Sequence, residues 1–119
     1  MESQDIAVSL RFERGIAILE VSGEIDLFTA PRFQSAVSTA IDEGYVRLLI
    51  DLSRVTFMDS KGYGALLTAA RKVKPVGGRI GLIGCNALVT RLVRLTRLDA
   101  VMELYDDLDR ALTGLAPDG

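Results

Sequence analysis

The chain has 119 residues, of which 49% are hydrophobic and 25% charged, and its formal net charge is −2. This composition fits one soluble globular domain, which we expect to span residues 1–119 with an ordered core from about 5 to 113. No basic block favours nucleic-acid binding, and no apolar run reaches the roughly 18 residues that a membrane-spanning helix needs. The first five residues are polar and acidic, unlike a signal peptide, so we expect a cytoplasmic protein.

Two residue types limit the chemistry. Histidine is absent, which excludes Ser–His–Asp and Cys–His catalysis and most zinc sites. Cys85 is the only cysteine; it cannot form an intramolecular disulfide, and after an apolar run a small buried side chain is the commoner role. The glycines match neither a dinucleotide fingerprint nor a Walker motif. None of these motifs supports a cofactor or a metal, and we expect neither.

Two strands are predicted at the start of the chain. Apolar residues alternate with polar or small ones from Ile6 to Phe12, and a second strand is predicted at 16–21 after the turn 13–15. Together they form a hairpin. Residues 22–26 are predicted to be a loop.

The next segment combines helical and then strand signals. Thr29 is a favourable N-cap, Pro31 suits a first helical turn, and Gly44 ends the predicted helix. A nearly continuous apolar run at 46–52 then predicts a central strand, followed by a turn at 53–54. The apolar stripe of the helix comprises Phe33, Ala36, Val37, Ala40 and Ile41.

The second half again alternates strands and helices. The segment 55–58 leads into a helix that begins at Asp59 or Ser60 and stops at 75–78, with a core stripe of Tyr63, Leu66, Leu67, Ala70 and Val73 or Lys74. A strand is then predicted at 79–83, followed by a helix that Asn86 caps and that carries the apolar residues Leu88, Val89, Leu92 and Val93. An extended piece at 100–104 precedes a last helix at 108–112, which Asp106 or Asp107 caps. The tail from Gly114 is predicted to be frayed.

This alternation predicts the fold class. Strand–helix–strand units of this length form right-handed crossovers between parallel strands. We expect an α/β domain whose mixed, mostly parallel sheet has four to five strands and carries four helices.

Ser60 is the main candidate functional residue. It follows Asp59 at the N-terminus of a predicted helix, where free backbone N–H groups and the helix dipole favour an anion. Ser60, or Asp59, could simply cap the helix. Alternatively, Ser60 is a regulatory phosphoacceptor, whose phosphate would add about −1.5 to −2 charges and block a docked partner.

Two neighbouring regions have a structural and a functional interpretation each. The outer face of the second helix carries small residues among basic ones, which indicates either ordinary helix propensity and packing or a smooth docking surface for a protein: Lys61, Ala65, Thr68 and Lys72, with Gly64 and Arg71 at the edge. Gly62, in the first turn of the same helix, is a further candidate for partner binding. Asp26 and Thr29 flank the first helix, and their structural interpretation is a turn residue and an N-cap. Alternatively, Asp26 lies beside Ser60 and forms an acidic corner with Asp59 and Ser60, because parallel strands end at one edge of the sheet. No base of suitable pKa accompanies them, so a hydrolase site is not indicated.

Three segments resemble the bacterial anti-sigma factor antagonists, which are single STAS domains. They are residues 23–30 (GEIDLFTA), 49–52 (LIDL) and 55–64 (VTFMDSKGYG), and the resemblance extends over residues 5–113. It implies a non-enzymatic regulator that binds an anti-sigma factor with serine kinase activity, is released when the kinase phosphorylates Ser60, and is reset by a serine phosphatase. A monomer or weak dimer is expected, with no direct contact to nucleic acid or membrane.

The chain departs from the family at three positions. Lys61 stands where a second serine is common, Tyr63 where leucine is common, and Arg97 where a helix-ending glycine is common. If position 97 needs a positive φ, arginine there costs about 1 kcal/mol of stability. Rival functions are a scaffold STAS protein of a stress-signalling complex, an accessory subunit of a lipid transporter, and a small-ligand or nucleotide-binding domain.

Overall fold

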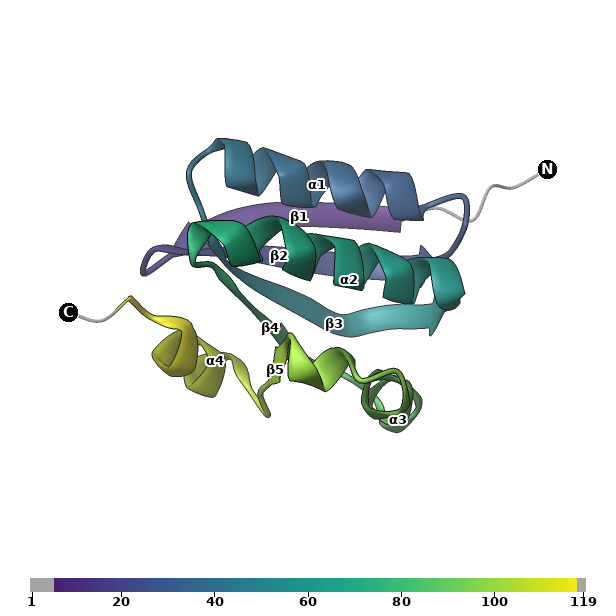
Figure 1. Ribbon diagram of the computed structural model, residues 1–119. Coiled ribbons are helices and arrows are strands. Elements are labelled where there is room, and N and C mark those ends of the chain that lie inside the picture. The colour runs from purple at the N-terminus through teal and green to yellow at the C-terminus, as the bar shows by residue number, and fades with distance from the viewer. Residues whose placement is uncertain (1–5, 118–119) are drawn as a thin grey trace.

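In the computed structural model, which describes residues 6–117, a five-stranded sheet carries helices on both faces (Figure 1). The strand order is β1-β2-β3-β4-β5; β1 pairs antiparallel with β2, and the remaining neighbours are parallel. The predicted fold class is confirmed. The elements are β1 (Ile6–Glu13), β2 (Ile16–Ile25), α1 (Ala30–Asp42), β3 (Arg47–Met58), α2 (Ser60–Val73), the 3-10 helix η1 (Lys74–Val76), β4 (Arg79–Ile83), α3 (Ala87–Leu95), the 3-10 helix η2 (Leu98–Ala100), β5 (Glu103–Leu104) and α4 (Leu108–Leu115).

The central strands divide their side chains between two cores, because successive residues of a strand point to opposite faces. Leu48 and Ile50 of β3 face the larger core, which α1, α2 and part of α3 cover. Leu49, between them, faces a smaller core that α4 covers with Leu112 and Leu115. Burial on both faces explains why 46–52 is almost continuously apolar.

The predicted loop at 22–26 and the predicted turn at 53–54 are wrong. β2 continues to Ile25 and β3 to Met58. Two irregularities in the β2–β3 register, between Glu20 and Ser22 and between Gly23 and Glu24, keep these polar stretches paired. On the face of the sheet that α4 partly covers, the polar residues of β2 and β3 beyond α4 line a hollow of about 420 Å³. Polar residues can therefore occupy the strands without being buried.

The structure also tests three expectations about single residues in the second half of the chain. Leu88, one of the apolar residues that the predicted helix carries, is 64% exposed. The predicted frayed tail from Gly114 is corrected, because α4 extends to the fully buried Leu115. Arg97 has φ +63°, in the left-handed region, so the condition under which arginine costs about 1 kcal/mol at that position is met.

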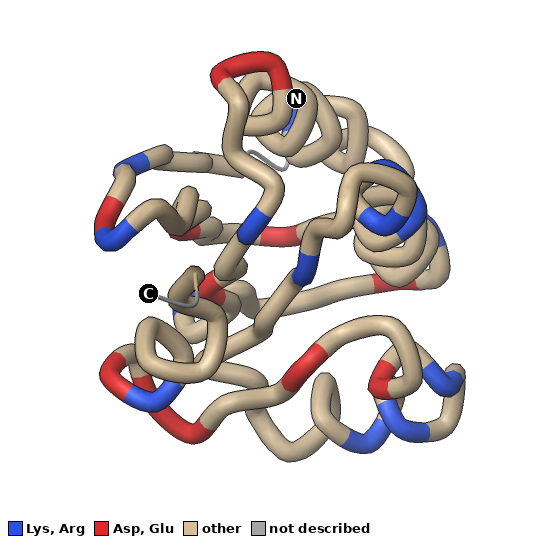
Figure 2. The backbone as a smooth tube through the Cα atoms, turned by 60° about the vertical axis from the view of Figure 1, so that its left-hand side comes forward, with Lys and Arg blue, Asp and Glu red and all other residues tan. Residues whose placement is uncertain are grey.

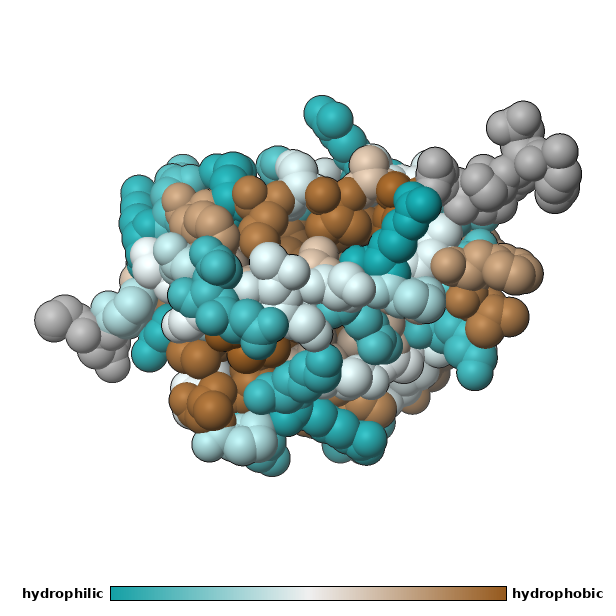
Figure 3. Space-filling model, turned by 90° about the horizontal axis from the view of Figure 1, so that it is seen from above, coloured by the Kyte–Doolittle hydropathy of each residue, from teal (hydrophilic) through white to brown (hydrophobic). Residues whose placement is uncertain are grey.

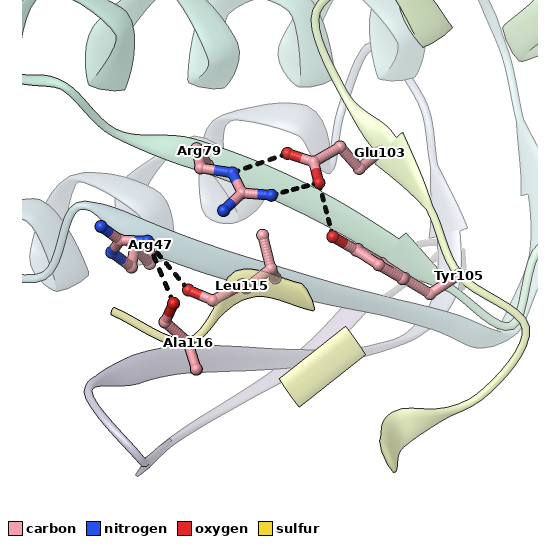
Figure 4. A network of polar contacts seen from close by, with 6 residues as sticks. All are labelled: Arg47, Arg79, Glu103, Tyr105, Leu115 and Ala116. Carbon is pink, nitrogen blue, oxygen red and sulfur yellow. Dashed lines mark hydrogen bonds and ion pairs between the residues drawn. The ribbon is translucent and has the colours of Figure 1, made fainter. Parts of the chain in front are cut away.

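Polar contacts hold the C-terminal segment against the sheet (Figure 4). Arg47 donates to the carbonyl oxygen of Leu115 at 3.1 Å, and Arg79 Nε donates to Glu103 Oε2 at 2.8 Å. The hydrogen bond from Arg79 lowers the pKa of Glu103. Burial, aided by a hydrogen bond to Glu103, raises the pKa of Tyr105 to about 12. These groups have structural partners and lie on β3, β4 and the β5–α4 segment, away from the start of α2.

Candidate functional site

The starts of α1 and α2 lie together at the edge of the sheet where β2 and β3 end (Figure 1). Ile25 pairs with Met58 at the last step of the β2–β3 ladder, and the Asp59 amide donates to the Ile25 carbonyl oxygen at 3.2 Å. The shared edge expected for Asp26, Asp59 and Ser60 is therefore present.

Asp59, and not Ser60, caps α2. Its Oδ1 accepts hydrogen bonds from the amides of Lys61 at 2.9 Å and Gly62 at 3.1 Å. Ser60 is the first helical residue; its side chain is exposed, and its hydroxyl has no hydrogen bond to another residue between 6 and 117. Because Asp59 supplies the cap, the Ser60 hydroxyl is available for chemistry.

Gly62 sets the close approach of α2 to the end of β2. A Cβ at this position would lie 2.7 Å from the Ile25 carbonyl oxygen and 2.4 Å from Met58 Cγ. Real Cβ atoms essentially never show contacts this short, so any residue other than glycine here would force the surrounding structure, including the Ile25 backbone, to shift. Gly62 therefore positions the turn that presents Ser60 and is itself buried.

Asp26 and Thr29 form a closed hydrogen-bonded turn before α1. Asp26 Oδ1 accepts from the amides of Phe28 at 2.9 Å and Thr29 at 3.0 Å. The Thr29 hydroxyl donates to the Glu24 carbonyl oxygen at 2.6 Å and accepts from the Asp26 amide at 2.9 Å. Thr29 occupies the N-cap position, but its hydroxyl bonds to the turn and makes no cap bond to α1. With 3% exposure, Thr29 cannot contact a partner.

The outer surface of α2 is basic. The helix contains Lys61, Arg71 and Lys72 and no acidic residue. Figure 2 shows blue segments and no red ones on its turns. Arg71 follows Ser60 by 71 − 60 = 11 residues, about 16 Å along the helix axis at 1.5 Å per residue. Arg71 and Lys72 thus belong to the far end of α2, and Lys72 Nζ donates to Ser38 of α1 at 2.9 Å.

Neither titratable group behind this edge is suited to act as a nucleophile. Burial, with a contribution from the Asp51 charge, raises the pKa of Cys85 to about 11, so the thiol stays protonated at neutral pH. Burial likewise raises the pKa of Tyr63, whose hydroxyl is buried without a hydrogen-bond partner. Within residues 6–117, no group of three or more His, Cys, Asp or Glu residues could hold a metal ion.

Comparison with known proteins decides the family. A STAS domain model matches residues 7–111. The chain belongs to the STAS domain family. The anti-sigma-F factor antagonist RsfB of Mycobacterium tuberculosis is 32% identical over 92% of this chain and 89% of its own length. A crystal structure of an anti-sigma factor antagonist from Mycobacterium paratuberculosis has a TM-score of 0.85 and 33% identity, covering 95% of this chain and 96% of that one.

More distant structures share the fold of this STAS domain. The anti-sigma factor antagonist SpoIIAA has TM-scores of 0.73 in its unphosphorylated form and 0.72 in its phosphorylated form, at 23% and 24% identity; each match covers 91% of this chain, and 96% and 98% of the respective SpoIIAA chain. Proteins of the anti-sigma factor antagonist type are regulatory binding proteins rather than enzymes. No helix in the described part of the chain is long and apolar enough to cross a membrane.

The docking face predicted on α2 needs correction in this STAS domain. Ala65 is 1% exposed and packs in the main core, together with Ala69. The core stripe is rotated from the predicted one, because α2 packs against both the sheet and α1, and small residues allow that double contact. Gly64, Lys61 and Arg71 are exposed and Thr68 is half-buried, so only these and Lys72 remain as surface candidates on α2 beside Ser60.

Sequence reasoning missed three exposed apolar side chains at this edge of the STAS domain. Leu27 is 56% exposed, Phe28 82% and Phe57 50%. Leu27 and Phe28 are consecutive apolar residues between the predicted loop at 22–26 and the predicted N-cap Thr29, and this position outside any predicted strand or helix was the available signal. Their exposure shows that this edge combines a free hydroxyl with apolar surface.

Proposed function

We propose that this chain is an anti-sigma factor antagonist switched by phosphorylation of Ser60. In its unphosphorylated form it binds an anti-sigma factor that is also a serine kinase, and so regulates transcription that depends on the corresponding sigma factor. The observation that carries the proposal is the free, exposed hydroxyl of Ser60 at the N-terminus of α2, beside an Asp59 that already caps the helix. The sequence similarity to anti-sigma factor antagonists over most of the chain supports an anti-sigma factor as the class of partner.

Phosphorylation would act by charge and bulk at the docking edge. A phosphate adds about −1.5 to −2 charges, which the helix N-terminus and the neighbouring Lys61 can accommodate. A partner seated over Ser60 would have to move away from the added group. The solved phosphorylated form of SpoIIAA supports the compatibility of this fold with phosphorylation. A serine phosphatase would reset the switch, and the cycle would take place in the cytoplasm with the protein as a monomer or weak dimer.

The test uses the purified chain and the anti-sigma factor kinase encoded in the same genome. We expect one phosphate on the wild type by intact mass after incubation with MgATP, none on Ser60→Ala, and one on the control Ser35→Ala. Ser60→Ala should bind the kinase at least as tightly as the wild type, and Ser60→Asp more weakly. Phosphate on Ser60→Ala, or equal binding by the wild type, Ser60→Asp and the phosphorylated protein, would contradict the proposal.

A further inference from the structure

The segment joining β2 to α1 presents two apolar side chains to solvent between buried neighbours. Leu27 is 56% and Phe28 82% exposed, whereas Ile25 is 0%, Thr29 3% and Ala30 7% exposed. Seen from above, hydrophobic side chains project at the end of the molecule where β2 runs into α1 (Figure 3). An exposed phenylalanine beside a leucine that is more than half exposed contributes little to the stability of the fold, because most of the apolar surface of the two side chains stays in water.

The backbone beneath these side chains is held in one conformation. Asp26 Oδ1 accepts from the amides of both Phe28 and Thr29, and the buried Thr29 hydroxyl bridges the Glu24 carbonyl and the Asp26 amide. The Ala30 amide donates to the Asp26 carbonyl oxygen at 2.8 Å. Leu27 and Phe28 therefore stand on a fixed turn, and little backbone freedom would be lost when a partner covers them.

This turn is continuous with the edge that carries Ser60. The Ile25 carbonyl, one residue before the turn, accepts from the Asp59 amide at 3.2 Å, and Gly62 packs on the same carbonyl. Phe57, 50% exposed, pairs with Glu24 at the end of the β2–β3 ladder. A protein that covers Ser60 would meet this apolar surface at its border.

We propose that Leu27 and Phe28 form an apolar anchor that inserts into a hydrophobic pocket of the anti-sigma factor docked over Ser60. This inference rests on the proposed function. Continuity with the Ser60 edge favours that occupant over a lipid surface or a second copy of the chain. Buried aromatic side chains at rigid positions supply most of the affinity of many interfaces. The anchor carries no charge and does not touch the phosphoacceptor hydroxyl, so it strengthens docking without being switched itself.

The experiment measures binding to the anti-sigma factor kinase and phosphorylation for the variants Phe28→Ser and Leu27→Ser. The control is Leu95→Ser, because Leu95 at the end of α3 is similarly exposed (65%). We expect Phe28→Ser to weaken binding about tenfold or more and Leu27→Ser by a smaller factor, with Leu95→Ser unchanged. Phe28→Leu should retain most of the affinity. Phosphorylation of Phe28→Ser should still reach one phosphate at saturating kinase, with a raised KM and an unchanged kcat. All variants should keep the wild-type melting temperature, because the replaced side chains are exposed.

The outcomes separate the two proposals. If the wild type binds the kinase and is phosphorylated on Ser60, but Phe28→Ser binds equally well, the anchor is wrong and the switch stands. If the wild type neither binds nor is phosphorylated, the proposed function fails. Co-sedimentation of the wild type with phosphatidylcholine–phosphatidylglycerol vesicles that Phe28→Ser abolishes would overturn the anchor in favour of a lipid surface. A dimer in analytical ultracentrifugation that Phe28→Ser dissociates would overturn it in favour of self-association.

Discussion

The helices α1 and α2, which start at the edge of the sheet where β2 and β3 end, begin in chemically similar but structurally different ways. Each follows a parallel strand, and each has an aspartate and a hydroxyl residue at its start. Before α1, Asp26 and Thr29 bond to each other and to the strand end, and Thr29 is buried. Before α2, Asp59 alone caps the helix, and the hydroxyl of Ser60 is exposed. The Thr29 hydroxyl is therefore engaged in the fold, whereas the Ser60 hydroxyl is free of it.

The spacing of the two residues explains the difference. In the first turn, Leu27 and Phe28 separate Asp26 from Thr29, so the chain closes a loop whose interior the Thr29 hydroxyl fills. In the second, Ser60 directly follows Asp59, and the carboxylate bonds to amides beyond it. Ser60 is thereby left outside the capping bonds. Hydrogen bonds thus hold the first turn rigid, whereas the second turn leaves the Ser60 hydroxyl accessible to solvent.

The largest effect should come from filling the contact between the two turns. We expect Gly62→Ala to destabilise the domain by about 3 kcal/mol, because its Cβ would lie 2.7 Å from a backbone carbonyl oxygen that cannot easily move. Gly64→Ala is the matched control: its Cβ would have no neighbour within 4 Å, and it should stabilise α2 by about 0.5–1 kcal/mol. Urea denaturation measures both. Equal stabilities of the two variants would show that the start of α2 is not fixed against Ile25.

A second, smaller effect tests the closed turn before α1. We expect Thr29→Val to lose about 2 kcal/mol of stability, because its isosteric side chain leaves the part-buried Glu24 carbonyl and Asp26 amide without the Thr29 hydroxyl as a partner. Thr39→Val, which removes an exposed hydroxyl bonded to the Ser35 carbonyl oxygen, should change stability by less than about 0.5 kcal/mol. A Thr29→Val protein as stable as Thr39→Val would mean that the hydroxyl is not structural.

Sequence reasoning predicted the order of strands and helices and the shared edge, because hydrophobic periodicity and glycine positions are local signals. The corner Asp59–Ser60 was predictable from the same signals. Which of the two residues caps the helix was not, because both types cap well and only the backbone geometry decides. The burial of Ala65 depends on α1 packing beside α2, a contact between segments distant in the sequence. The loop at 22–26 and the turn at 53–54 were mispredicted because the sheet tolerates polar residues on the part of this face that α4 leaves uncovered.

The cap of α2 gives the third expected effect. Asp59→Ala should cost about 1 kcal/mol, since the Lys61 and Gly62 amides lose the carboxylate that satisfies them. Asp59→Asn should recover most of that loss, because its amide oxygen can accept the same bonds. Thermal unfolding monitored by circular dichroism compares the three proteins. An unchanged midpoint in Asp59→Ala would place the cap elsewhere, and Ser60 would be the residue to examine.

The smallest effect is expected at Ser60 itself. If Asp59 holds the cap and the Ser60 hydroxyl bonds to nothing in the fold, Ser60→Ala should change the free energy of unfolding by less than about 0.5 kcal/mol. Alanine is also the better helix former at this first helical position, which opposes any small loss. If the proposed function holds, the same substitution should also abolish phosphorylation by the kinase, so one variant separates the effect on the fold from the effect on phosphorylation. A loss near 1 kcal/mol or more in Ser60→Ala would show that the hydroxyl supports the helix start. The contrast between a structural Thr29 and a free Ser60 would then be wrong.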